Sequence, residues 1–194
     1  MTTSILLAGV GGQGTILMSK ILSDGLIQLG YDVKMSEIHG MSQRGGSVTT
    51  QVRFGEKVYA PNIGHGEADY IVAFEKLEAL RMLPFLKKDG MIIADSHEIY
   101  PVPVLTGQSA YPTNAIDAIR SVVSKVVVIP AAEVAEKLGN IRAQNIVLLG
   151  ALTRSLALDG ADWRTLVAKH VPPKTIEMNL NAFEAGHSMN SYVV

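Results

Sequence analysis

Residues 5–14 read Ile-Leu-Leu-Ala-Gly-Val-Gly-Gly-Gln-Gly, a short apolar run followed by a glycine-rich turn. The residues after this turn repeat apolar side chains at helical spacing up to Leu29, and Gly30 then provides a stop. A strand, a glycine turn and a helix in this order are typical of an α/β fold in which a ligand approaches the helix N-terminus. The stretch therefore predicts the first unit of such a fold.

Strand and helix patterns alternate along the rest of the chain. Strands are predicted at residues 31–37, 70–74, 91–94 and 125–129, and helices at 76–86, 114–124, 131–138, 141–158, 163–170 and 175–185. Residues 47–54 alternate apolar and polar side chains, Gly55-Glu56 is a turn signal and residues 57–59 return, which predicts a β-hairpin. We therefore expect a three-layer, Rossmann-like α/β fold, with a mostly parallel sheet, helices on both faces and an inserted antiparallel β-hairpin.

Composition limits the class of protein. A chain of 194 residues with 47% hydrophobic content fits one domain over residues 1–194. Its formal net charge of -1 provides no basic field for nucleic acid. The sequence has no cysteine, which excludes disulfides, a cysteine nucleophile and thiolate-held iron–sulfur clusters on this chain. The N-terminal apolar run is too short to span a bilayer, so we expect a cytoplasmic protein with no membrane partner.

The first glycine turn is the first candidate site. Gly9, Gly11 and Gly14 satisfy the G-x-G-x-x-G pattern of dinucleotide folds, and Glu37 ends the second strand, where such folds place a ribose-binding acid. The alternative is that the glycines only permit close packing of strand and helix. Gln13 is unusual for an NAD site, because its amide offers a donor and an acceptor where a small residue would leave space.

A second loop follows the second strand and leaves the sheet at the same edge, so the two loops predict a ligand crevice. Arg44 beside two glycines offers a donor fork for phosphate or carboxylate, or else pairs with Glu37 on the surface. His39 is either an acid–base group or a structural hydrogen-bonding residue. The candidate residues of this crevice are Gly11, Gly12, Gln13, Gly14, Glu37, His39, Ser42, Gln43, Arg44, Gly45 and Gly46. The other histidines are scattered, so no metal site is expected.

Residues 9–14 and 36–46 together resemble the gamma domain of the pyruvate/2-oxoisovalerate:ferredoxin oxidoreductases, and are most similar to the beta subunits of indolepyruvate ferredoxin oxidoreductases. The similarity extends through Phe74-Glu75-Lys76-Leu77-Glu78-Ala79, through residues 145–152 and through residues 172–177. It therefore covers nearly the entire chain, which is more specific than a glycine motif.

The resemblance implies a subunit that does not act alone. In that family a larger alpha subunit carries thiamine diphosphate, Mg and 4Fe-4S clusters, and the complex decarboxylates an aryl 2-oxoacid, forms the acyl-coenzyme A and reduces ferredoxin. The small subunit resembles the domain that closes over this site. It is expected to bind no cofactor by itself and to contact coenzyme A as co-substrate, or the 2-oxoacid, through the candidate crevice residues.

The residues by themselves are also compatible with two other functions. One is a stand-alone dinucleotide-binding or regulatory protein, which the glycine turn and Glu37 would serve. The other is an interaction module whose loops bind only the alpha subunit. No catalytic residue is assigned.

Overall fold

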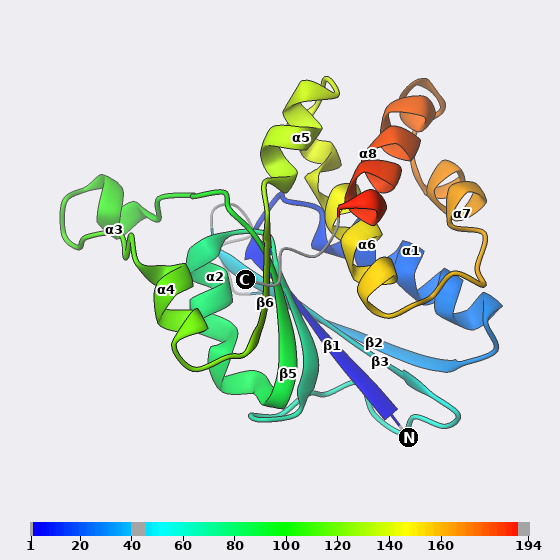
Figure 1. The fold of residues 1–194 in the computed structure, drawn as a ribbon, viewed down its shortest axis with the longest axis horizontal. Helices are drawn as coiled ribbons and strands as arrows, with labels where there is room; N and C mark the ends of the chain where they lie inside the picture. The colour runs from blue at the N-terminus through cyan, green and yellow to red at the C-terminus, as the bar shows by residue number, and fades with distance from the viewer. Residues whose placement is uncertain (1, 40–45, 190–194) are drawn as a thin grey trace.

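Apolar strands rich in Ile, Leu and Val form a six-stranded sheet in the computed structural model, which describes residues 2–39 and 46–189 (Figure 1). The strands are β1 (Thr2–Val10), β2 (Asp32–His39), β3 (Ser47–Gly55), β4 (Ala68–Ala73), β5 (Leu86–Asp95) and β6 (Lys125–Ile129), in the order β2-β3-β1-β4-β5-β6. Strands β1, β4, β5 and β6 run parallel, whereas β3 is antiparallel to both β1 and β2. The mostly parallel sheet of the sequence prediction is confirmed.

Helices cover both faces of this sheet (Figure 1). One face packs against α1 (Thr15–Gln28), α5 (Ala131–Lys137), α6 (Gln144–Ser155), α7 (Trp163–His170) and α8 (Ile176–Ser188), and the other against α2 (Lys76–Met82) and α4 (Ala115–Arg120). Short turns of 3-10 helix lie at Leu83–Phe85, Ile141–Ala143 and Pro173–Thr175, and the short helix α3 (Val102–Leu105) projects from the body. The three-layer arrangement is therefore also confirmed.

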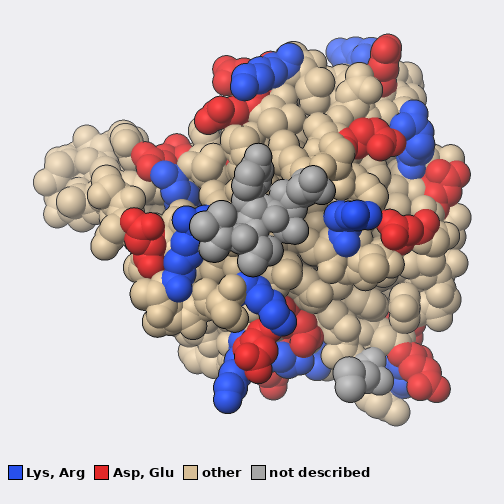
Figure 2. All heavy atoms as spheres, in the orientation of Figure 1, with Lys and Arg blue, Asp and Glu red and all other residues tan. Residues whose placement is uncertain are grey.

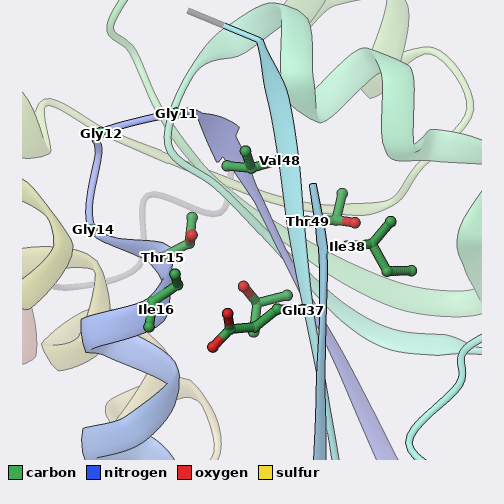
Figure 3. A pocket seen from close by; sticks show the side chains of 10 residues that line it. Gly11, Gly12, Gly14, Thr15, Ile16, Glu37, Ile38, Val48 and Thr49 are labelled. Atoms are coloured by element: carbon green, nitrogen blue, oxygen red, sulfur yellow. The ribbon is translucent and has the colours of Figure 1, made fainter. Parts of the chain in front are cut away.

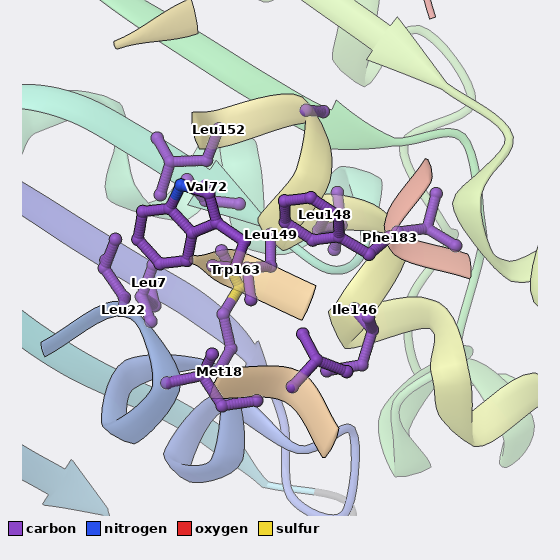
Figure 4. Close-up of a cluster of buried hydrophobic side chains, with 14 of the residues drawn as sticks. Leu7, Met18, Leu22, Val72, Ile146, Leu148, Leu149, Leu152, Trp163 and Phe183 are labelled. Carbon is purple, nitrogen blue, oxygen red and sulfur yellow. The ribbon is translucent and has the colours of Figure 1, made fainter. Parts of the chain in front are cut away.

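The larger core lies between the sheet and the α1, α6, α7 and α8 layer. Trp163, the only tryptophan of the sequence, is 5% exposed and packs among Leu7, Met18 and Leu22 (Figure 4). Its indole N–H donates to the backbone oxygen of Leu158 across 2.7 Å, which satisfies its polar atom inside the core. A Cβ at Gly25 would lie 2.2 Å from the indole ring, so this glycine lets the ring reach helix α1.

The hairpin prediction was correct about an antiparallel element and wrong about its partner. Strand β3 pairs with β2, in a register that places Glu37 opposite Thr50, instead of with residues 57–59. The carboxylate of Asp32 accepts the backbone N–H of Val58 across 2.9 Å, so the segment after β3 is held by a side chain and forms no ladder. The hydrogen bonds from Lys34 and Val58 lower the pKa of Asp32, since both favour its charged form.

The predicted helix at residues 76–86 ends earlier in the structure. Helix α2 stops at Met82, Pro84 sits in the following 3-10 turn, and Leu86 already pairs with Ala68 in the sheet. Proline cannot donate to an α-helical ladder, which explains the change. Residues Lys87 to Gly90, which lie between the predicted helix and the predicted strand at 91–94, belong to β5.

Candidate functional site

The first glycine turn joins β1 to α1 in the manner the sequence predicts. Gly12 and Gly14 have φ values of 104° and 84°, a region that is unfavourable for other residues. Gly14 is the N-cap of α1, and the first helical hydrogen bond runs from Met18 N to Gly14 O at 3.1 Å. The first turn of α1 carries no acidic side chain, so its backbone N–H groups and the helix dipole give this end a positive potential.

The second loop meets the first at its C-terminal end. The backbone N–H of Gly11 donates to the oxygen of Gly46 across 2.9 Å, and Val10 pairs with Ser47 at the start of β3. The ends of β1 and β2 and the start of β3 therefore lie at one edge of the sheet. The described ends of the second loop therefore lie beside the first glycine turn.

A cleft of about 390 Å³ opens between α1 and strands β2 and β3 (Figure 3). Its lining residues are Gly11, Gly12, Gly14, Thr15, Ile16, Glu37, Ile38, Val48, Thr49 and Thr50. Figure 3 shows the Glu37 carboxylate on the α1 side of the sheet, near Thr15 and Ile16, while Ile38 and Thr49 point to the opposite side. The cleft thus combines backbone N–H donors at one wall with a carboxylate acceptor at the other.

This arrangement suits a ligand with two different polar parts. An anionic group is favoured beside the N-terminus of α1, and hydroxyl or amide donors are favoured beside the Glu37 carboxylate. Strand β3 lies between β1 and β2, so Glu37 is two strand spacings, about 10 Å, from β1. A dinucleotide fold has its acid on the neighbouring strand instead, which makes this cleft wider than a dinucleotide site.

Gln13 turns away from the cleft, contrary to the expectation that its amide faces the ligand. Its Oε1 accepts the backbone N–H of Val10 at 2.7 Å, and its Nε2 donates to Phe74 O at 2.9 Å and to Gln144 Oε1 at 3.3 Å. The side chain is therefore occupied by the protein itself. It fixes the glycine turn to the end of β4 and to helix α6.

The same network continues to a buried carboxylate. Gln144 Nε2 donates to Phe74 O at 2.7 Å and to Asp95 Oδ2 at 2.6 Å. Asp95 is fully buried and also accepts the backbone N–H groups of His97, Ala131 and Ala132. Burial raises the pKa of Asp95, against the opposing effect of these hydrogen bonds. Asp95 thereby ties β5 to the start of α5.

A third contact ties α2 to the second loop. Glu78 is 1% exposed, and its carboxylate accepts from Ser47 Oγ at 2.5 Å and from Arg81 at 2.6 Å. Ser47 directly follows Gly46, so this buried carboxylate anchors the place where the loop rejoins the sheet. Glu75, one turn earlier, caps α2 by accepting the N–H of Glu78 at 3.0 Å.

Of the predicted site residues, Gly11, Gly12, Gly14 and Glu37 line the cleft, and Gly46 is bonded to Gly11. The backbone of His39 ends β2 opposite Val48, but its side chain lies outside the described part of the structure. Ser42, Gln43, Arg44 and Gly45 also lie outside the described residues.

Sequence reasoning did not assign Thr15, Ile16, Ile38, Val48, Thr49 or Thr50 to the site, although they line the cleft. Two of them could have been found from the sequence, because the alternating pattern of residues 47–54 puts Val48 and Thr50 on one face of the strand. The network partners Gln144 and Asp95 gave no such signal, since they are far from Gln13 in the sequence.

A family model described as pyruvate ferredoxin/flavodoxin oxidoreductase matches residues 4–189. The chain belongs to this family. It is 40% identical over 190 residues to the indolepyruvate oxidoreductase subunit IorB of Thermococcus kodakarensis, covering 94% of this chain and 93% of that protein. The family predicted from the two loops is confirmed, and the chain is a small, non-autonomous subunit of a 2-oxoacid:ferredoxin oxidoreductase.

Two solved structures share the fold. The pyruvate oxidoreductase subunit PORC of Thermotoga maritima superposes with a TM-score of 0.72 at 18% identity, over 96% of this chain and 95% of that one. The 2-oxoglutarate:ferredoxin oxidoreductase of Magnetococcus marinus gives a TM-score of 0.74 at 21% identity, over 96% of this chain and 30% of that chain. The fold therefore occurs both as a separate subunit and as part of a longer chain.

Two further observations concern the residues that the structure describes. Within residues 2–39 and 46–189, no group of three or more His, Asp or Glu side chains is placed to hold a metal ion. No helix in these ranges is both long and apolar enough to cross a membrane.

Proposed function

We propose that this chain completes the active site of a cytoplasmic, hetero-oligomeric indolepyruvate:ferredoxin oxidoreductase, acting as one domain. The reaction oxidatively decarboxylates an aryl 2-oxoacid to its acyl-coenzyme A and passes the electrons to ferredoxin. The cleft between the glycine turn and Glu37 carries this proposal, because it lies at the edge of the sheet where the glycine turn is hydrogen-bonded to the end of the second loop. The name of the Thermococcus relative supports the choice of substrate.

The reactive cofactors are proposed to lie on the larger alpha subunit. A 4Fe-4S cluster needs thiolate ligands and this sequence has no cysteine, so its residues do not fit a cluster. In the described part of the chain no three His, Asp or Glu side chains are grouped to hold a metal ion. No step of the chemistry is therefore assigned to groups held by this chain.

The proposed role of this chain is to bind and orient coenzyme A or the oxoacid. The N–H groups of Gly11 and Gly12 and the N-terminus of α1 are suited to a phosphate or carboxylate. Arg44, Gly45 and Gly46 would extend this anion site from the second loop. Glu37 would accept hydroxyl or amide protons of the ligand. The solved relative from Magnetococcus marinus contains 2-oxoglutarate, coenzyme A and succinyl-CoA, which supports a coenzyme A contact.

The test uses the complex of this chain with its larger subunit, loaded with thiamine diphosphate and clusters. Coenzyme A-dependent reduction of a viologen dye is measured with indolepyruvate, phenylpyruvate and 2-oxoglutarate. We expect turnover to be fastest with the aryl substrates. Failure with every oxoacid in a fully loaded complex would contradict the proposed function.

The site assignment has its own test. Arg44→Ala should raise the KM for coenzyme A or the oxoacid about tenfold or more, as loss of one charge-assisted contact does. Arg142→Ala removes an exposed arginine from the 3-10 turn Ile141–Ala143 and should leave both KM values unchanged. Equal kinetics of the two variants would remove Arg44 from the site.

A stand-alone dinucleotide-binding function is the alternative, and Glu37 beside a glycine turn is the observation in its favour. Calorimetry of the isolated chain distinguishes the two, because micromolar binding of NAD or FAD without a partner would support the alternative. Strand β3, which lies between β1 and β2, makes the cleft wider than a dinucleotide site, and this argues against the alternative.

A further inference from the structure

A segment between β5 and α4 projects from the body of the molecule. Residues 96–112, here called the arm, include helix α3 and form the protrusion at the left of Figure 1. From Ile99 to Ile116 the sequence carries no charged residue. In Figure 2 the protrusion is accordingly free of blue and red, whereas both charges are mixed over the rest of the visible face.

The arm is exposed despite its apolar composition. Eight of the ten residues from Pro101 to Ala110 are exposed, and Tyr100, Val102 and Leu105 have 49%, 69% and 70% of their surface accessible. Solvated loops usually carry charged or strongly polar side chains. An uncharged projection with large apolar side chains is instead typical of the centre of a protein–protein contact.

The arm also has a defined conformation. Its chain turns back on itself through hydrogen bonds from Leu105 N to Pro101 O at 3.1 Å and from Gln108 N to Pro103 O at 2.8 Å. Fixing a backbone costs conformational entropy, which is normally offset by burial. Since the tip of the arm buries little surface within this chain, the burial that offsets this cost is expected from another chain.

The base of the arm is fixed to the body. The Tyr111 hydroxyl donates to the carboxylate of Glu75, which is 1% exposed and also accepts Ile99 N at 3.3 Å. The Tyr100 and Tyr111 rings lie 5.1 Å apart. Burial, together with the neighbouring Glu75, raises the pKa of Tyr111, which keeps it protonated as a donor. The two ends of the arm therefore converge on a single buried carboxylate, and this presents the tip rigidly.

We propose that the arm is the docking element by which this chain holds the larger subunit of the oxidoreductase. This inference rests on the proposed function. The matching region of the Magnetococcus marinus protein is 30% of a longer chain, so the fold is also found joined to further parts of an enzyme. A permanent neighbour of that kind buries apolar surface.

The chemistry of the arm selects this occupant over ferredoxin. Encounters with electron carriers are transient and guided by complementary charge, and residues 99–112 of the arm carry no charged side chain. The complementary surface on the larger subunit is accordingly an apolar hollow that is poor in charged residues. A second copy of this chain is the other possible occupant, and the experiment distinguishes it.

The experiment measures the affinity of the full chain for the larger subunit by biolayer interferometry. Val102→Asp and Leu105→Asp should each weaken binding at least tenfold, because a buried charge would lie in the contact. Val122→Asp is the matched control: Val122 is 70% exposed, lies outside the arm after helix α4, and should change the affinity less than twofold. Thermal unfolding of each variant checks that the fold is intact.

Hydrogen exchange supplies a second measurement, since the amides between residues 102 and 110 should exchange more slowly in the complex than in the isolated chain. Equal affinities of the three variants, or no added protection of the arm in the complex, would overturn the proposal. Self-association of the isolated chain that only the arm variants abolish, with unchanged binding of the larger subunit, would assign the arm to a second copy and also overturn it.

These outcomes are separate from the proposed reaction. An arm-dependent complex that oxidises no 2-oxoacid contradicts the proposed function and leaves the docking inference standing. An active complex that tolerates both Asp variants contradicts only the docking inference. A wild-type chain that binds no larger subunit contradicts both.

Discussion

The side-chain amide of Gln13 donates a hydrogen bond to the backbone oxygen of Phe74 across 2.9 Å, and this contact joins the glycine turn after β1 to the end of β4. These two strands are neighbours and parallel, and the chain leaves them toward opposite faces of the sheet. Such a point is the usual ligand crevice of an open α/β sheet. Here Gln13 and Gln144 fill it, so the open cleft lies beside it, over β2 and β3.

Gln13→Ala should lower the free energy of unfolding by about 1–3 kcal/mol, because the N–H of the buried Val10 loses its acceptor. The loosened turn should also raise the KM for coenzyme A in the assembled enzyme. Gln28→Ala is the control: its Oε1 accepts only an exposed hydrogen bond from Asp162 N, so its effect should stay within about 0.5 kcal/mol. Urea unfolding followed by Trp163 fluorescence measures both, and equal losses would contradict the role of Gln13.

Gly14→Ala combines two penalties. Residue 14 has a positive φ, which is unfavourable for alanine, and a Cβ there would lie 2.4 Å from Asn145 Nδ2. We therefore expect the free energy of unfolding to fall by about 2–4 kcal/mol. Residue 12 also has a positive φ, but a Cβ there would point into open space. Gly12→Ala should therefore lower the free energy of unfolding by only about 1–2 kcal/mol. Asn145 Nδ2 also donates to Gly14 O at 3.2 Å, so Asn145→Ala has a cost of its own, and this cost should be smaller in the Gly14→Ala background than in the wild type or in Gly12→Ala. An equal cost in all three backgrounds would show that the collision is unimportant.

Ser47→Ala should destabilise the protein by about 1–2 kcal/mol, because the buried carboxylate of Glu78 loses one of the two donors that the described residues provide. Ser121→Ala removes an exposed local bond to Ala118 O and should change stability by less than about 0.5 kcal/mol. Chemical unfolding compares the two. If both variants lose equally little free energy of unfolding, Glu78 does not anchor the second loop through Ser47.

The pair of Lys76 and Glu98 predicts a pH dependence. The hydrogen bond from Lys76 lowers the pKa of Glu98 below its ordinary value of 4.5, against the opposing effect of burial. The stabilisation is therefore present above pH 4.5 and is lost as the pH falls through the lower, folded-state pKa. Glu98→Gln should be less stable than the wild type by about 0.5 kcal/mol near pH 7 at low salt, and equally stable near pH 2. A difference that is constant across this range would exclude the ion pair as its cause.

The sequence predicted those parts of the fold whose signals are local. The first strand, the glycine turn and helix α1 follow from an apolar run, glycines and a helical period within one short stretch, and the predicted helix at residues 163–170 coincides with α7. The partner of β3 could not be predicted in this way, because an alternating pattern states which face is buried but not which strand lies alongside. The choice depends on Asp32, whose carboxylate removes Val58 from pairing.

The candidate site was likewise predicted only where its signals are local. Gly11, Gly12, Gly14 and Glu37 were identified because glycine turns and strand ends are recognisable locally, and the cleft contains all four. The direction of Gln13 was not predictable, because its partners Phe74 and Gln144 are 61 and 131 residues away. No helix was predicted between residues 94 and 114, since the four residues of helix α3 are too short to show a helical period.

The position of β3 between β1 and β2 also sets the order in which the sheet can assemble. In the described sheet β1 pairs only with β3 and β4, and β2 only with β3. A nascent chain that has left the ribosome as far as β2 therefore carries two strands that have no native ladder between them. The pairing of β2 with β3 is more local than that of β1 with β3, so we expect it to form first and β1 to join its open side afterwards. The two strands that line the ligand cleft, β2 and β3, are thus also the first pair of the sheet that we expect to form.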